Sequence, residues 1–243
     1  MKKDLTSPVK GILIAALAVV AIFTLTGGIG TTCVAWNAKG LGPIFAPMAD
    51  YATFYQSTVV INILVGLALF MITYAFVRAE KWAYNAAVIT LFIGGGSGAV
   101  KMYISQMVRG GTAPTNVRVY FTVAALIIFL IARLPFIWNR IDLTRKPEGE
   151  TSYSIPTGMA FLAAGLSQLA ITLFAIPSHV VDGVNYVNYL AVQFYVISGV
   201  LTVIGAGLLL SVKYKLNLDA RLASFIKSIY NMFVPTKEVK ELR

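Results

Sequence analysis

Six long apolar runs constrain this chain more than any other feature of its sequence. A helix that crosses the hydrocarbon core of a bilayer needs about 20 apolar residues, and each run is close to that length. We therefore predict an all-α integral membrane protein in which residues 1–217 form a six-span transmembrane helix bundle. The predicted spans lie near 11–30, 58–77, 84–108, 117–138, 155–176 and 189–212.

The composition agrees with a chain that is surrounded by lipid. Hydrophobic residues make up 58% of the 243 residues, whereas charged residues make up 12%. Soluble domains have about 25% charged residues. This chain therefore has too few polar side chains to cover a water-soluble globule, and we expect the lipid bilayer to be its main partner.

The distribution of Lys and Arg predicts the orientation in the membrane. If the N-terminus is inside, the cytoplasmic segments carry most of the basic residues, as is usual for membrane proteins. We therefore expect a multi-pass protein of the plasma (cytoplasmic) membrane with both termini cytoplasmic. The net charge of +10 lies mostly at segment ends, so nucleic acid is not an expected partner. The outer segments carry only Lys39, Lys101, Arg109 and Arg118.

Residues 218–243 form a basic tail in which apolar residues recur at helical spacing. This pattern predicts an amphipathic helix on the cytoplasmic face, with its apolar side in the lipid and its cations at the headgroups. A helix that packs on a partner or on the inner loops is the alternative. The apolar positions are Leu218, Leu222, Phe225, Ile226, Ile229 and Phe233.

The third apolar run contains a cluster of glycines at positions 94, 95, 96 and 98. Gly94 and Gly98 form a GxxxG pair, which is typical of closely packed membrane helices. In the first run, Gly27 and Gly28 offer another small-residue surface. We therefore predict helix-packing roles for these four glycines.

Lys101 follows on the same helical face as Ser97 and Ser105. Two interpretations stay open: the lysine reaches outward to the headgroups, or it is buried and lines a polar site. Arg109 and Arg118 flank the next loop, on the side where positive charge is disfavoured.

The acids assigned to the outer side are Asp50 and Asp182, against four cations. The excess positive charge suggests a bound anion or lipid phosphate, because Arg suits phosphate geometry. We therefore hypothesise an anion or headgroup site. Its candidate residues are Lys101, Arg109, Arg118, Ser97 and Ser105.

Other polar residues within the runs have ordinary structural roles. Asn62 and Gln168 are predicted to form hydrogen bonds between helices. Arg133 is expected to reach the inner headgroups, and Pro135 to kink the fourth helix. In the outer segment, Trp36, Tyr51, Phe54 and Tyr55 are expected to form an interfacial aromatic belt.

The sequence offers few groups for cofactor or metal chemistry. With one cysteine, Cys33, and one histidine, His179, the chain has no internal disulfide, no paired-histidine haem and no zinc site built on several His and Cys. We therefore expect no cofactor and no metal.

The segment Gly95-Gly96-Ser97-Gly98 resembles the GxSG nucleophile motif of the rhomboid proteases, which are six-span membrane enzymes. The resemblance covers four residues and implies Ser97 as nucleophile and His179 as its base. That family carries its serine on the fourth span and its base within the sixth. Here Ser97 lies on the third predicted span and His179 between the fifth and the sixth.

Three functions are compatible with these features. The first is a non-enzymatic accessory or anchoring subunit of a membrane assembly, with other membrane subunits or a second copy of the chain as partners. The second is a transporter or binding protein for a small anionic solute or lipid headgroup. The third is a membrane-embedded hydrolase.

Overall fold

The computed structural model describes residues 6–43, 45–109, 115–145, 154–174, 180–181, 184–185 and 187–214. The long helices are α1 (Thr6–Gly30), α3 (Ala52–Val77), α4 (Ala83–Arg109), α5 (Thr115–Ala132), α7 (Ser154–Phe174) and α8 (Val187–Lys213). Shorter elements are α2 (Thr32–Asn37), η1 (Lys39–Leu41), η2 (Ala46–Tyr51) and α6 (Pro135–Trp138). Strands β1 (Val180–Val181) and β2 (Val184–Asn185) form a short antiparallel pair.

The prediction of a helical membrane protein is confirmed at the level of these elements. Each predicted apolar run overlaps one long helix. Among the described residues, four helical segments are long and apolar enough to cross a membrane, and α5 supplies a shorter apolar stretch, Arg118–Ala132. The four segments are Pro8–Asn37, Ala46–Val77, Ala83–Arg109 and Ala191–Val212.

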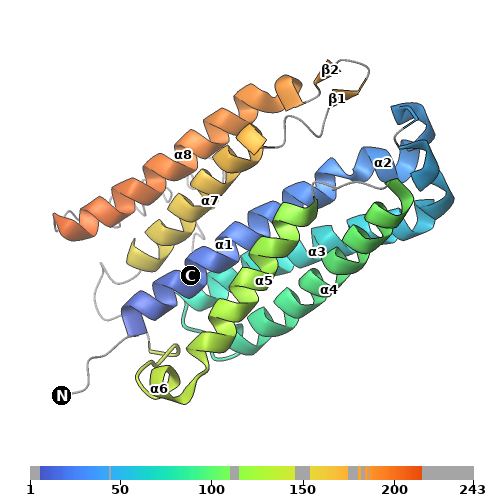
Figure 1. Ribbon diagram of the computed structural model, residues 1–243. Coiled ribbons are helices and arrows are strands. Elements are labelled where there is room, and N and C mark those ends of the chain that lie inside the picture. The colour runs from blue at the N-terminus through green and yellow to red at the C-terminus, as the bar shows by residue number, and fades with distance from the viewer. Residues whose placement is uncertain are drawn as a thin grey trace, which may run out of the picture.

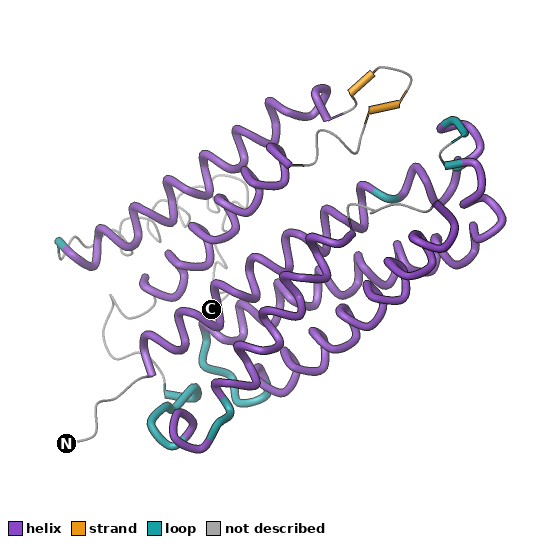
Figure 2. Tube along the Cα trace, in the orientation of Figure 1, coloured by secondary structure: helices purple, strands orange, loops and turns teal. Residues whose placement is uncertain are grey.

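Helices α1, α3, α4 and α5 form a bundle, and the α7–α8 hairpin lies beside it (Figure 1). The hairpin packs on the bundle mainly through α7, which runs along α1. The tube in Figure 2 shows α2 and the two strands at one end of the molecule and the turn around α6 at the other. Helix α1 is therefore central, because it contacts α3, α5 and α7.

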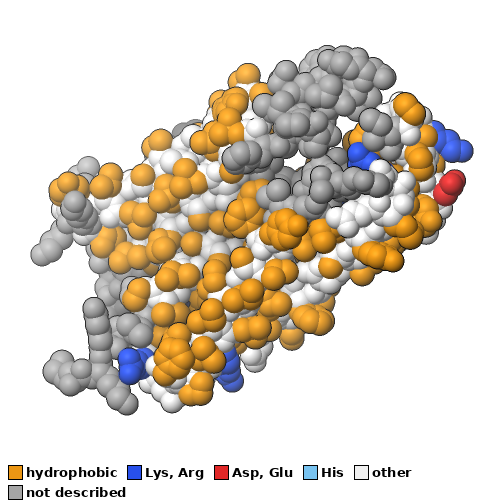
Figure 3. Space-filling model, in the orientation of Figure 1, with side chains coloured by type: hydrophobic (Ala, Val, Ile, Leu, Met, Phe, Trp, Pro, Cys, Tyr) orange, Lys and Arg blue, Asp and Glu red, His pale blue; other side chains and the backbone are white. Residues whose placement is uncertain are grey.

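A continuous apolar core runs through the four-helix bundle. Leu13, Leu17, Leu69, Leu91 and Phe129 are fully buried in it. The outward faces are also apolar, and the charged side chains gather at the two ends of the molecule (Figure 3). This surface suits hydrocarbon along its sides and water or headgroups at its ends.

The fourth predicted span does not continue as one helix to residue 138. Helix α5 ends at Ala132, and α6 begins at Pro135. Leu134 has an extended ψ of 137°, because a proline disfavours the helical conformation of the residue before it. The predicted kink is therefore a break. The Arg133 guanidinium lies 4.0 Å from the centre of the Trp138 ring.

The outer segment between α1 and α3 is largely helical and packs on the bundle. Met48 and Tyr55 belong to a second buried cluster with Ala35, Ala38 and Val59. The placement of Tyr55 in an interfacial belt was therefore wrong, since this side chain is 1% exposed. The predicted amphipathic helix over 218–243, together with His179 and Asp182, lies outside the described residues.

Candidate functional site

Two cations are buried where α1, α3, α4 and α5 meet, toward the end of the bundle that carries α2. Lys101 on α4 is 2% exposed, and Arg118 in the first turns of α5 is 3% exposed. The two side chains come from neighbouring helices, and a Cβ at Gly98, three residues before Lys101 on α4, would lie 2.5 Å from Arg118 Nη2. Of the two interpretations of Lys101, the structure therefore supports the buried cation and not the one that reaches the headgroups.

Asn62 on α3 holds one side of the Arg118 guanidinium. Arg118 Nη1 donates a hydrogen bond of 2.6 Å to Asn62 Oδ1. Hydrogen bonds from a charged donor are shorter and stronger than neutral ones. The predicted interhelical hydrogen bond of Asn62 is confirmed, and it joins α3 to α5. By contrast, Gln168 Nε2 on α7 is buried without a hydrogen-bond partner among the described residues.

The rest of the Arg118 guanidinium is buried without a partner. Neither Nε nor Nη2 has a hydrogen-bond partner within the described part of the chain, and the same is true of Asn62 Nδ2. A buried N–H group that bonds neither to protein nor to water is costly, by about 1–3 kcal/mol and more for a charged group. Three nitrogens with unused donors, Arg118 Nε, Arg118 Nη2 and Asn62 Nδ2, therefore lie around the Arg118–Asn62 hydrogen bond.

Lys101 is held by a hydroxyl from the end of α1. Its Nζ donates a hydrogen bond of 2.9 Å to Thr31 Oγ1. The Thr31 hydroxyl in turn donates to the carbonyl oxygen of Gly27, at 2.8 Å. An ammonium has three donors, so this single neutral acceptor leaves most of the capacity of Lys101 unused.

No carboxylate neutralises the pair within the part of the chain that the structure describes. Neither Lys101 nor Arg118 forms an ion pair there, and the sequence has no Asp or Glu between Glu80 and Asp142. Asp50, in η2, is exposed. Burial of an Arg or Lys in a membrane bundle without an opposite charge is unfavourable, so two uncompensated cations carry a free-energy cost.

Glycines shape the space around the guanidinium. A Cβ at Gly98 would lie 2.5 Å from Arg118 Nη2, so a larger residue there would displace the end of the Arg118 side chain. A Cβ at Gly28 would lie 3.2 Å from Asn62 Cβ, and one at Gly27 would lie 3.6 Å from Arg118 Cδ. The fourth glycine singled out for packing, Gly94, faces Val65 of α3.

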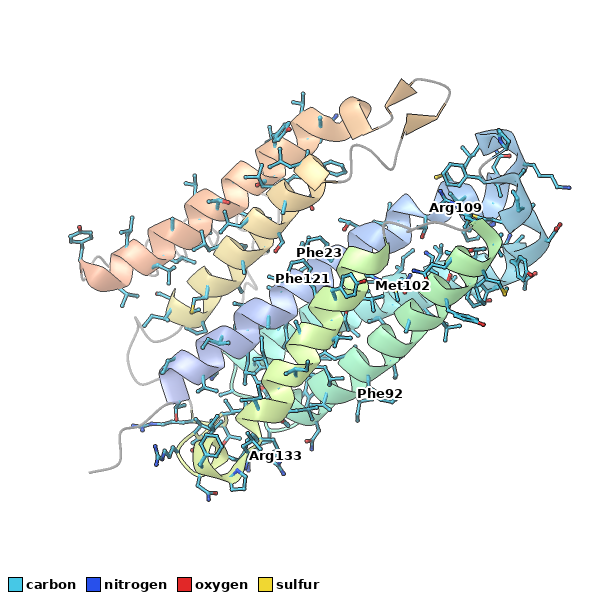
Figure 4. The ribbon with its side chains drawn as sticks, viewed as in Figure 1. Phe23, Phe92, Met102, Arg109, Phe121 and Arg133 are labelled. Carbon is cyan, nitrogen blue, oxygen red and sulfur yellow. The ribbon has the colours of Figure 1, made fainter. Side chains whose placement is uncertain are left out.

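The other predicted site residues bond elsewhere. Ser105 is buried, and its hydroxyl lies 3.0 Å from that of Tyr55. Ser97 donates to the carbonyl oxygen of Gly94 in its own helix. Arg109 lies over the Phe45 ring, 4.6 Å from its centre, and Figure 4 shows it near the end of α4. The structure therefore brings together Lys101 and Arg118, not the five predicted residues.

Two residues of the site were missed as ligands of the cations. Thr31 and Asn62 carry neutral side chains, and only their position within or at the end of an apolar run marks them. The hydrolase hypothesis gains no support from Ser97, because its hydroxyl donates a hydrogen bond to the carbonyl oxygen of Gly94 within α4. The described residues also contain no group of three or more His, Cys, Asp and Glu that could hold a metal ion.

Comparisons with known protein families, with curated proteins and with solved structures give no match to this chain.

Proposed function

We propose that this chain is a membrane protein that binds a small anion, or the anionic headgroup of a lipid, at Lys101 and Arg118. One observation supports this function above others: two cations are buried side by side with only neutral partners among the described residues. Ionisable residues inside a membrane bundle commonly mark ion or substrate sites, because their burial is otherwise unfavourable. An anion supplies the missing negative charge.

The proposal includes six spans with both termini in the cytoplasm of a plasma (cytoplasmic) membrane protein. Its support is that α5 and α7 run alongside the four longer helices (Figure 1) and that Lys and Arg concentrate at one set of segment ends. In this topology the cation pair lies toward the outer leaflet. An outward position suits a ligand from outside the cell or an outer-leaflet lipid.

The pair is enclosed, so binding requires a local movement. The free donors of Arg118 are buried, with α4 directly against them at Gly98. An anion therefore reaches them when the Arg118 side chain turns or when α4 and α5 separate at this end. Such a movement is compatible with a binding protein and with a transporter.

The test is thermal unfolding of the purified protein in mild detergent, with sodium phosphate, sulfate and chloride at matched ionic strength. A ligand that binds the folded state stabilises it by about 2.7 kcal/mol at 100 times its Kd. We expect at least one anion to raise Tm in a saturable way, and we expect Lys101→Ala and Arg118→Ala to remove that increment. The readout is the anion-dependent increment, since removal of a buried cation can itself change the basal Tm.

Lys39→Ala is the matched control, because Lys39 is an exposed cation in η1. It should keep the full increment. An equal increment in all four proteins would show that anions act through the general surface charge, and it would contradict the proposed site.

An accessory or anchoring subunit remains a second candidate, and the surface of α8 favours it. Val192, Val196 and Val203 are exposed on α8, and Gly199 and Gly207 face open space. Small residues on an open helix face let another helix approach closely. Purification in mild detergent should then yield a partner in a fixed ratio, and a lone monomer would count against this candidate.

A further inference from the structure

The free edge of Arg118 indicates which class of anion would bind, if the pair binds an anion as proposed above. Nη1 is used by Asn62, whereas Nε and Nη2 both have no partner among the described residues. These two nitrogens form one side of the planar guanidinium. That side donates two parallel hydrogen bonds to two oxygens of the same oxyanion. A single-atom halide cannot accept both in this way.

The groups around that edge are donors as well. Asn62 Oδ1 accepts from Arg118, and Asn62 Nδ2 has no partner in the part of the chain that the structure describes. Lys101 Nζ gives one hydrogen bond to Thr31 and has further donors available. A ligand at this point must therefore be rich in acceptors, carry negative charge and need no acceptor from the protein.

We propose that the pair takes a phosphate group, with two of its oxygens on Arg118 Nε and Nη2 and a third facing Lys101 Nζ. A phosphate offers several acceptor oxygens on one central atom and, as a free ion, up to two negative charges against the two cations. A monovalent carboxylate has two oxygens and occupies the Arg118 edge alone. The phosphate group of a lipid and the free phosphate ion share this chemistry.

Gly98 on α4 lies against the edge of Arg118 that would bind the phosphate group. A Cβ at position 98 would lie 2.5 Å from Nη2 and 2.8 Å from Val119 Cγ2. An alanine there would displace the guanidinium without removing either positive charge. Gly98→Ala is therefore a variant that changes the position of the free edge and not the charge of the site.

The experiment compares inorganic phosphate with chloride by thermal shift at matched ionic strength. In the wild-type protein, the half-saturating concentration of phosphate should be at least about tenfold lower than that of chloride. Arg118→Lys keeps the charge but loses the two-nitrogen edge, so the preference should fall to within about threefold. Gly98→Ala should reduce the preference in the same direction, and it covers the case in which Arg118→Lys does not fold. Lys39→Ala should keep the preference.

The outcomes show whether the phosphate assignment alone is wrong or whether the anion site is wrong as well. If chloride and phosphate act equally in the wild-type protein, and Lys101→Ala removes both effects, anion binding stands and the phosphate assignment is wrong. If Arg118→Lys keeps the full preference, the two-nitrogen geometry is wrong. If no anion stabilises the wild-type protein, or if Lys101→Ala responds like it, both proposals fail.

The source of the phosphate is found with a short-chain phosphatidic acid added to the delipidated protein. A lipid ligand should half-saturate at a lower concentration than inorganic phosphate and should stay bound in native mass spectrometry. A free-ion ligand should show the reverse order, with inorganic phosphate the tighter of the two. The phosphate assignment is wrong if chloride stabilises the protein but neither phosphatidic acid nor inorganic phosphate does.

Discussion

At the scale of single residues, Asn62 determines how Arg118 is held. Asn62 Oδ1, 2.6 Å from Arg118 Nη1, is the one side-chain acceptor that this guanidinium has among the described residues. Hydrogen bonds to charged groups contribute about 1.5–3 kcal/mol to stability. Asn62 therefore orients the guanidinium without neutralising it, and the positive charge stays available.

A carboxylate at position 62 should act as a built-in anion. Asn62→Asp keeps the size of the side chain and places a negative charge 2.6 Å from Arg118 Nη1 if the geometry is unchanged. We expect a higher Tm in the absence of added anion, because the buried guanidinium gains a partner. We also expect the Tm increment from phosphate to be lost. Thermal unfolding with and without phosphate measures both effects.

Asn62→Leu is the comparison for that variant. It removes the Asn62 Oδ1 acceptor of Arg118, so Tm without phosphate should fall; a hydrogen bond to a charged group contributes about 1.5–3 kcal/mol to stability. An Asn62→Asp protein that still gains the full phosphate increment would show that the anion binds elsewhere.

The two cations could be singled out from the sequence, but their partners could not. Lys101 and Arg118 stand out because they carry positive charge on the side where it is disfavoured. Thr31 and Asn62 are 70 and 56 residues away from the cations that they bind. Such contacts depend on which helices become neighbours, and the hydrophobic pattern of a single helix does not contain that information.

At the scale of elements, the α7–α8 hairpin depends on close backbone contact. A Cβ at Gly165 would lie 2.5 Å from Thr202 Oγ1 and 2.7 Å from the Thr202 backbone nitrogen. A Cβ at Gly205 would collide with the backbone of Leu162. Ser198 Oγ also donates to the Gly165 carbonyl oxygen, at 2.7 Å. The two helices can lie this close only if both positions are glycine.

Alanine at either contact glycine should therefore loosen the hairpin. We expect Gly165→Ala and Gly205→Ala each to destabilise the protein by about 1–3 kcal/mol, the usual range for overpacking. Gly199→Ala and Gly207→Ala serve as controls, because no atom lies within 4 Å of a Cβ at those positions. They should be neutral or slightly stabilising, since alanine favours helix over glycine. Chemical or thermal unfolding ranks the four variants.

If all four Gly→Ala variants changed the unfolding stability by the same amount, helix propensity and not contact between α7 and α8 would determine the stability of the hairpin. A loss in the Gly199 and Gly207 variants alone would point to another helix that covers the open face of α8.

The existence of the long helices was predictable, and their interruptions were less so. A run of about 20 apolar residues is a strong signal because the bilayer fixes the length. The break after α5 follows from Pro135, yet a proline can kink a membrane helix without ending it. The short helices α2 and η2 carry no length signal, so the lengths of the apolar runs do not predict them.

At the scale of the whole molecule, charged side chains lie at the two ends and apolar side chains lie between them. Figure 4 places Arg109 near one end and Arg133 near the other, with Phe92 on the apolar surface between them. Phe92 is 71% exposed, which suits contact with hydrocarbon and not with water. The sides of the molecule are therefore the expected lipid contact, and in the proposed topology each end faces a different aqueous compartment.

The single cysteine offers a direct test of the orientation. Cys33 is an exposed thiol in α2, at the end that we place outside. A membrane-impermeant maleimide should label it in intact cells. For comparison, Asn139 is exposed at the opposite end. In a Cys33→Ser background, Asn139→Cys should be labelled only after the membrane is permeabilised. The reverse pattern would invert the proposed topology.

The central place of α1 also has a consequence for biogenesis. The ribosome makes α1, α3, α4 and α5 first, and the residues that contact Lys101 and Arg118 lie on these helices or directly after α1. The nascent chain can therefore shield both cations from hydrocarbon before α7 leaves the exit tunnel. The final hairpin then docks on a bundle that is already assembled, so the costly step of insertion is complete before synthesis ends.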